Sequence, residues 1–227
     1  MDHFQTATTT EEWKVAVSAL GKLKDYKDVT QLYAEARFKL AASERADGNL
    51  TGAVRLLSEL HNEGYEAAED TYSEVAAELY AQAKQEYNAG HWGTARQQMQ
   101  SLAVGNYEDS AALAENCDER IQEGRNKFNG IWRSPYSPHI MSDDLKIVMG
   151  DTGESTIYNS GGMSATGQEK WERSYYTAIQ YDNDTETLSF CYVGMTYVAS
   201  VNGNTMTITP TEDALALSFA GTYTRES

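Results

Sequence analysis

The feature that most constrains this chain is a repeat of about forty residues in its first half. A leucine and a tyrosine mark each unit, as Leu20 with Tyr26, Leu60 with Tyr65, and Leu102 with Tyr107. A second set recurs with a displacement of 42 residues, from Gly48, Ala53 and Leu57 to Gly90, Ala95 and Met99. Self-similarity at this period is typical of stacked helix pairs, in which each unit buries an apolar stripe against the next. The first half is therefore predicted to be a helical scaffold, and scaffolds of this kind bind other molecules.

The apolar residues of this half follow the helical period. The clearest stripe consists of Tyr72, Val75, Ala76, Leu79, Tyr80, Ala83 and Tyr87. Shorter stripes bring the expected number of helices to six, and Thr9 with Glu12 has the spacing of a capping box before the first. Glycines stand where the helices should end. We expect three helix pairs in an N-terminal domain of residues 1–126, which is about the minimum for a stable array.

The chain from Leu79 onward resembles the tetratricopeptide consensus. In that consensus a helix ends at a glycine, an aromatic residue follows two positions later, and a small alanine lets the next helix pack closely. The matching residues are Leu79, Tyr80, Ala83, Tyr87, Gly90, Trp92 and Ala95. The corners at Tyr65 and Tyr107 also resemble those of surface proteins of clostridial-type bacteria. The resemblance implies a protein-binding scaffold at a bacterial cell surface, although the peptide-binding residues of the tetratricopeptide family cannot be carried over.

Aromatic residues at helical spacing are usually core residues. We therefore expect the repeat tyrosines to pack between helices with their hydroxyls at the surface, exposed ligand contacts being the alternative, at Tyr26, Tyr65, Tyr72, Tyr80 and Tyr107. Cys117 occupies a stripe position and is predicted to be a small buried hydrophobic residue. Cys191 lies in the other half of the chain, so a structural disulfide is not expected. The two cysteines therefore do not indicate whether the protein resides in an oxidising or a reducing compartment.

The second half has the composition of strands and turns. All three prolines follow residue 134, and Thr, Ser, Tyr, Val and Gly replace the helix formers. The apolar period changes to two, and residues 201–204, Val-Asn-Gly-Asn, are typical of a tight hairpin turn. We expect about eight short strands in an antiparallel meander over residues 130–227, with its exposed edges removed by closure into a barrel.

The start of this domain, Gly130-Ile131-Trp132, resembles the Gly-x-Trp signature of lipocalins and related calycins. In that family the tryptophan plugs one end of the barrel, and an arginine from the last strand covers it. Arg225 stands where such an arginine should be, and a guanidinium stacks well on an indole ring. The resemblance implies a structural pair, Trp132 with Arg225, that closes the barrel. The sequence is compatible both with a small filled barrel and with a barrel that encloses a ligand cavity.

The net charge of −16 argues against nucleic acid as a partner, because such binding depends on clustered Lys and Arg. It also argues against adsorption to anionic lipid. The first ten residues, MDHFQTATTT, have neither the basic nor the apolar part of a signal peptide, and eighteen apolar residues never run together. We expect no membrane span in this sequence, and any export signal or anchor would lie upstream of it.

Two groups of residues invite a chemical interpretation. Asp182, Asp184 and Glu186 alternate as in a calcium loop, but they lack the glycine and the final glutamate of an EF-hand. We interpret them as a solvated hairpin tip, because Asp and Asn suit turns. The scattered His3, His61 and His91 give no zinc site.

The second group could be read as a hydrolytic set and consists of Ser134, Ser137, His139, Asp143 and Asp144. It offers only a proline-bearing loop instead of the elbow that presents a nucleophile. No phosphate-binding glycine loop appears either. We therefore expect no catalytic residues, metal or cofactor.

These features together predict a multi-domain α + β protein, with a tetratricopeptide-like α-solenoid followed by a lipocalin-like antiparallel β-barrel. The expected function is a non-enzymatic binding or adaptor protein for a protein or peptide, as the exposed portion of a bacterial envelope protein. The envelope part comes from the resemblance alone. One alternative is a carrier of a small hydrophobic ligand inside the barrel, and a second is a hydrolase-type enzyme. A carrier needs an enclosed void, whereas a recognition module needs a filled interior and an external binding patch.

Overall fold

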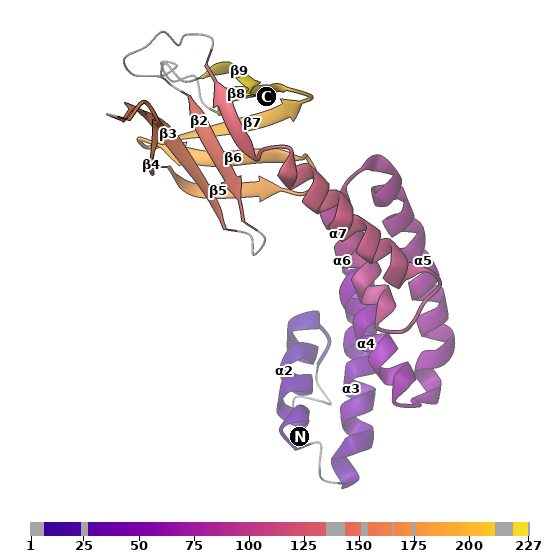
Figure 1. The fold of residues 1–227 in the computed structure, drawn as a ribbon. Coiled ribbons are helices and arrows are strands. Elements are labelled where there is room, and N and C mark those ends of the chain that lie inside the picture. Colours follow the sequence, from indigo (N-terminus) through magenta and orange to yellow (C-terminus); the bar gives the residue numbers. More distant parts are fainter. Residues whose placement is uncertain are drawn as a thin grey trace. The chain divides into compact units, whose positions relative to one another are not determined.

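The computed structural model describes residues 7–23, 27–134, 144–150, 154–164, 166–173, 176–211 and 220–226. The chain divides into two compact units, Met1–Asp118 and Glu119–Ser227. The division falls within the helix α7 (Ser110–Asn126), and the domain boundary expected from the sequence, between residues 126 and 130, lies at the end of the same helix. The first unit is helical and the second is built on a sheet (Figure 1).

Six α-helices are described in the chain. They are α2 (Thr10–Gly21), α3 (Lys27–Ala46), α4 (Leu50–Asn62), α5 (Glu69–Ala89), α6 (Trp92–Ala103) and α7, with a short 3₁₀ helix η1 (Glu66–Ala68) before α5. The capping box before α2 is present, since the Thr9 side chain accepts from the Glu12 amide and the Glu12 side chain accepts from the Thr9 amide. Gly90 ends α5 in the left-handed conformation, with φ of 83°, which glycine adopts without strain.

The helical unit has one apolar core. Its most completely buried large side chains are Leu57, Leu60, Leu79, Met99 and Leu102, none of which is more than 1% exposed. Tyr65, Tyr80 and Tyr107 pack against this core while remaining partly exposed. Tyr72 differs, because its hydroxyl is buried and has no hydrogen-bond partner among the described residues. Cys117 is buried and both cysteines are free, whereas Tyr26 lies outside the described residues.

The sheet unit contains nine described strands, all antiparallel to their neighbours. They are β1 (Gly130–Arg133), β2 (Leu145–Met149), β3 (Ser155–Met163), β4 (Glu169–Arg173), β5 (Thr177–Asp182), β6 (Thr187–Tyr192), β7 (Met195–Asn202), β8 (Thr205–Pro210) and β9 (Gly221–Arg225). Their order is β4-β3-β2-β1-β9-β8-β7-β6-β5, so the first and last strands pair in the middle of the sheet. The sheet curls through 246° into a half-barrel.

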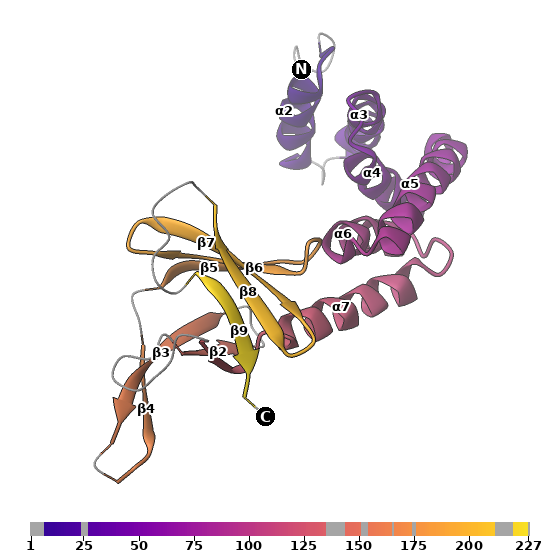
Figure 2. The same cartoon turned by 90° about the horizontal axis from the view of Figure 1, so that it is seen from above.

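The prediction of a closed barrel is wrong, because β4 and β5 form the two edges of the sheet and do not pair with each other. Local irregularities explain the opening. The β3–β4 register shifts between Ser160 and Met163, and the β5–β6 register shifts between Thr177 and Gln180. Bulges of this kind bend a strand and interrupt its pairing. The β3–β4 hairpin accordingly extends away from β5 (Figure 2).

The inner face of the half-barrel is filled by side chains. Strand alternation sends one residue in two to this face, as in β2, where Leu145, Ile147 and Met149 are buried. The largest buried side chains of this second core are Phe128, Trp132, Phe190, Tyr197 and Tyr223, each at most 1% exposed. Among the described residues, no helix is both long enough and apolar enough to cross a membrane.

Candidate functional site

Trp132 and Arg225 lie opposite each other in the β1–β9 ladder. The guanidinium carbon of Arg225 is 4.6 Å from the centroid of the indole ring, and Arg225 also donates a hydrogen bond to the Lys127 carbonyl. The indole Nε1 donates to the Phe128 carbonyl at 2.9 Å. The structure thus brings the two residues together at the end of the half-barrel where the chain enters from α7. Their role as a barrel-closing pair stays a prediction.

The last turn of α7 is fastened to the sheet beside this pair. Arg125 donates to the Gly150 carbonyl at 3.0 Å, and its guanidinium lies 5.7 Å from the centre of the Tyr181 ring. Lys127 forms an ion pair with Glu186. Burial raises the pKa of the Tyr181 hydroxyl. Glu186 is therefore held in an ion pair with Lys127 and has a structural role at this end of the sheet.

Asp182 shapes the turn between β5 and β6. Its Oδ1 accepts hydrogen bonds from the amides of Asp184 and Thr185, both at 2.9 Å, and these bonds lower the pKa of the carboxyl. This is the geometry of an Asx turn. Over the described residues, no group of three or more His, Cys, Asp or Glu side chains is placed to hold a metal ion.

The histidines have other contacts. His61 stacks on Tyr72 at 5.2 Å, and the Nδ1 of His91 lies 2.6 Å from the Glu86 carboxylate. His3 lies outside the described residues.

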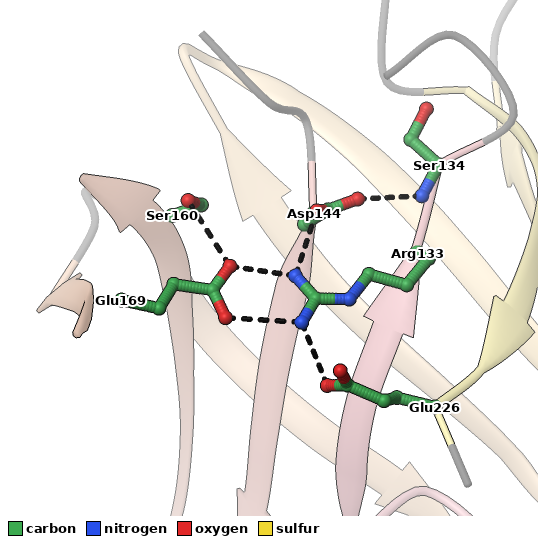
Figure 3. A network of polar contacts seen from close by, with 6 residues as sticks. All are labelled: Arg133, Ser134, Asp144, Ser160, Glu169 and Glu226. Atoms are coloured by element: carbon green, nitrogen blue, oxygen red, sulfur yellow. Dashed lines mark hydrogen bonds and ion pairs between the residues drawn. The ribbon is translucent and has the colours of Figure 1, made fainter. Parts of the chain in front are cut away.

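The most extensive polar network of the sheet unit centres on Arg133 (Figure 3). Its guanidinium donates to Asp144 at 2.9 Å, to Glu226 at 2.7 Å, and to both carboxylate oxygens of Glu169 at 2.6 and 3.0 Å. Ser160 donates to Glu169 at 3.5 Å. We call this group the Arg133 network. One cation therefore joins three carboxylates that come from different strands or strand ends.

Strand alternation explains why these residues meet. Trp132 points into the buried core, so Arg133 points to the opposite face. The hydrogen bond to Glu169, together with those to Glu226 and Asp144, raises the pKa of the Arg133 guanidinium. Both terminal nitrogens of the guanidinium donate to carboxylates of the chain itself, so the network braces the strands. It fixes the start of β4, and thereby the direction of the β3–β4 hairpin.

The group of residues that could be read as a hydrolytic set is only partly described. The Ser134 amide donates to Asp144 Oδ1 at 2.7 Å, and Asp144 Oδ2 accepts from Arg133. Asp144 is 4% exposed, so both of its oxygens serve as buried structural acceptors. Ser137, His139 and Asp143 lie outside the described residues, and no triad geometry can be drawn from Ser134 and Asp144 alone.

A cavity of about 320 Å³ lies at the opening of the half-barrel, between β3 and β5. It is lined by Glu154, Ser155, Thr156, Ile157, Arg173, Tyr176 and Ile179, and we call this place the seam. β4 pairs with β3 only from Tyr158 onward, so Ser155–Ile157 have no strand partner on that side in the described part of the chain. Among the described strands, β5 pairs with β6 alone. Two unpaired strand edges therefore line one cavity.

Charges of both signs stand at the seam. Glu154 and Arg173 are exposed, and neither forms an ion pair with another described residue. Most other arginines of the chain are engaged by carboxylates, as Arg37, Arg45, Arg96, Arg120 and Arg133 are. The seam thus combines backbone edges, hydroxyls, an apolar floor from Tyr176 and Ile179, and two charges that are available to a ligand.

The sequence did not point to the seam, although one signal was present. Gly161 and Gly162 lie within β3, and a glycine inside a strand pattern often marks a bulge. No family model, curated protein or solved structure matches the chain. Any assignment of function therefore depends on the geometry of the chain itself.

Proposed function

We propose that the protein is a non-catalytic binding protein that takes up an extended segment of a partner protein at the seam. The observation that carries the proposal is the pair of unpaired strand edges, at Ser155–Ile157 and on β5, that line the same cavity. An extended peptide can add to such an edge through main-chain hydrogen bonds, while pockets for alternate side chains give specificity. The chemistry of the seam matches this mode of recognition.

The residues of the seam have complementary roles in this proposal. Each main-chain hydrogen bond that an added strand makes contributes about 0.5–1.5 kcal/mol net. Tyr176 and Ile179 provide an apolar floor for one side chain of the segment. Arg173 and Glu154 select opposite charges on the segment and fix its direction. Free edges are also a hazard for aggregation, and the bulge at β5 limits indiscriminate pairing.

Two alternatives receive less support. A carrier of a hydrophobic ligand requires an enclosed void, whereas Trp132, Phe190, Tyr197 and Tyr223 fill the inner face. A hydrolase requires an activated nucleophile, whereas Asp144 is held by Arg133 and the Ser134 amide. Both observations favour recognition at the seam.

We further propose that the helical unit is a stack of tetratricopeptide-like repeats and that the sheet is a lipocalin-like barrel left open at the seam. A recurring contact supports the first part, since Phe38 meets Tyr65 as Tyr80 meets Tyr107, 42 residues later. The pairing of β1 with β9 and the Trp132–Arg225 contact support the second. In this proposal the helices are a scaffold, and the setting at a bacterial cell surface rests on the resemblance alone.

Selection from a displayed library of random peptides tests the function. The whole chain should select peptides of high strand propensity that carry an acidic residue, and a central proline in such a peptide should abolish binding. Arg173→Glu should weaken binding about threefold to tenfold, because it replaces an attraction by a repulsion at an exposed position. Lys170→Glu is the matched control, since it makes the same charge change at an exposed position of β4.

Two results would contradict the proposal. The first is selected peptides that bind equally well to wild type and to Arg173→Glu. The second is a small molecule retained by the purified protein in native mass spectrometry, which would favour the carrier.

A further inference from the structure

Two corners of the helical unit, the surroundings of Tyr65 and of Tyr107, can be compared residue by residue, because residues 27–65 and 69–107 are related by a displacement of 42 positions. Phe38 contacts Tyr65 with ring centroids 5.9 Å apart, and Tyr80 contacts Tyr107 at 5.7 Å. Ala41 and Ala83, which also correspond, are both buried. The two corners are thus structurally equivalent. A difference in packing between them can therefore be traced to the corresponding residues that differ in type.

The second corner is filled by the ring of Tyr72. This side chain is 6% exposed. It stacks on His61 at 5.2 Å and meets Tyr107 edge-on at 6.4 Å. Its hydroxyl lies directly over Gly105, where an added Cβ would be only 2.0 Å from the oxygen. Tyr72 therefore completes the packing of its corner with an aromatic ring from the chain itself.

The first corner carries no ring at the position that corresponds to Tyr72. Thr30 stands where the second corner has Tyr72, and Glu63 stands where it has Gly105. A cavity of about 740 Å³ lies here, lined by Thr30, Gln31, Tyr33, Ala34, Gly64 and Tyr65 together with Glu63. We call it the corner pocket. Because Thr30 is smaller than Tyr72, space remains in the first corner between apolar side chains that occupy equivalent positions in both corners.

Glu63, which lines the corner pocket, belongs to a small acidic cluster. Glu59 and Glu63 share one cation, since Arg37 donates to each carboxylate at 2.7 Å. The Arg37 side chain is 4% exposed, whereas those of Glu59 and Glu63 are 46% and 57% exposed. Two carboxylates around one guanidinium leave a net charge of one negative unit that solvent and ligands can reach. A cation beside the pocket would complement it.

We propose that the corner pocket binds an aromatic side chain of a partner polypeptide, flanked in that partner by a lysine or arginine. The ring takes the place that Tyr72 fills in the second corner, against Tyr33, Ala34 and Tyr65. The neighbouring cation pairs with Glu63. The proposal concerns the helical unit and stands independently of the seam.

Tyramine and 3-(4-hydroxyphenyl)propionate test this proposal, because they carry the same ring with opposite charges. Two-dimensional ¹H–¹⁵N spectra of the whole chain should show shifts at Tyr33, Ala34 and Gly64 on addition of tyramine. The propionate should bind about threefold to fivefold more weakly, the range expected for one exposed charge pair. Thr30→Tyr supplies the ring in cis, so it should abolish these shifts and raise the midpoint of thermal unfolding.

Ser73→Tyr is the matched control, since it places the same ring at an exposed position of α5 and should leave tyramine binding unchanged. Glu63→Gln provides a second variant that does not depend on filling the pocket, and it should remove the preference for tyramine over the propionate. The absence of shifts in the wild type, or equal binding by Thr30→Tyr, would overturn the proposal. Self-association in sedimentation that Thr30→Tyr abolishes would identify a second copy as the occupant and would overturn it as well.

Discussion

Gly105→Ala provides the sharpest test of the packing described for the helical unit. The added Cβ would lie 2.0 Å from the hydroxyl oxygen of Tyr72, 2.6 Å from its Cζ and 3.1 Å from the Cβ of Ser58. The Tyr72 ring cannot swing aside freely, because it is held between His61 and Tyr107. Relieving such overpacking costs about 1–3 kcal/mol. Alanine also lowers the conformational entropy of the unfolded chain relative to glycine, which stabilises the folded state by up to about 1 kcal/mol.

We therefore expect the free energy of unfolding to fall by about 1–2 kcal/mol. Urea titration followed by circular dichroism at 222 nm, where the helices dominate, measures it. Tyr72→Phe serves as the second arm of a double-mutant cycle. Alone it should be neutral or stabilising, because it removes a buried hydroxyl that has no partner among the described residues. With this oxygen gone, Gly105→Ala should cost less by at least about 0.5 kcal/mol. Equal costs in both backgrounds, or no cost in either, would refute the reasoning.

Three further predictions concern other sites. Arg133→Met should lower stability by about 3 kcal/mol or more, because it leaves the 4% exposed Asp144 without its cation; a loss below about 1 kcal/mol in urea would contradict the bracing role. The hydrogen bond from the Tyr80 hydroxyl to Asp109 raises the pKa of Tyr80 to about 12. Stability from this bond is therefore complete below pH 10 and lost as the pH rises through 12; the titration curves of wild type and Tyr80→Phe at 295 nm should differ by one tyrosine that titrates near 12, and a difference near pH 10 would contradict the assignment. Arg173→Glu should change stability by less than about 0.5 kcal/mol, as its exposed side chain has no ion-pair partner among the described residues; a larger loss in the same urea titration would make Arg173 a structural residue.

Much of the fold could be predicted because it follows from local patterns. The stripe from Tyr72 to Tyr87 specifies a helix on its own, and the described helix α5 contains all of it. The expected hairpin at residues 201–204 is also present, and its turn, Gly203-Asn204, connects β7 with β8. Even the contact of Trp132 with Arg225, 93 residues apart, could be anticipated from the resemblance to lipocalins.

The open edge of the sheet could not be predicted in the same way. Closure depends on the summed twist of nine strands and on bulges at Ser160–Met163 and Thr177–Gln180, and a register shift leaves little trace in residue types. The Arg133 network was also missed. Glu169 and Glu226 are far from Arg133 in sequence, and only the pairing of intervening strands brings them within 3.0 Å of it.

Amide hydrogen exchange, measured by mass spectrometry with and without a selected peptide, tests the seam most directly. Without peptide, the edge of β5 should exchange quickly while the central strands β7 and β8 are protected, because only the latter have partners on both sides. With peptide, protection should rise at Ser155–Ile157 and along β5 and should be lost in Arg173→Glu. Protection that appears elsewhere while the seam continues to exchange quickly would contradict the claim that a partner completes the open half-barrel.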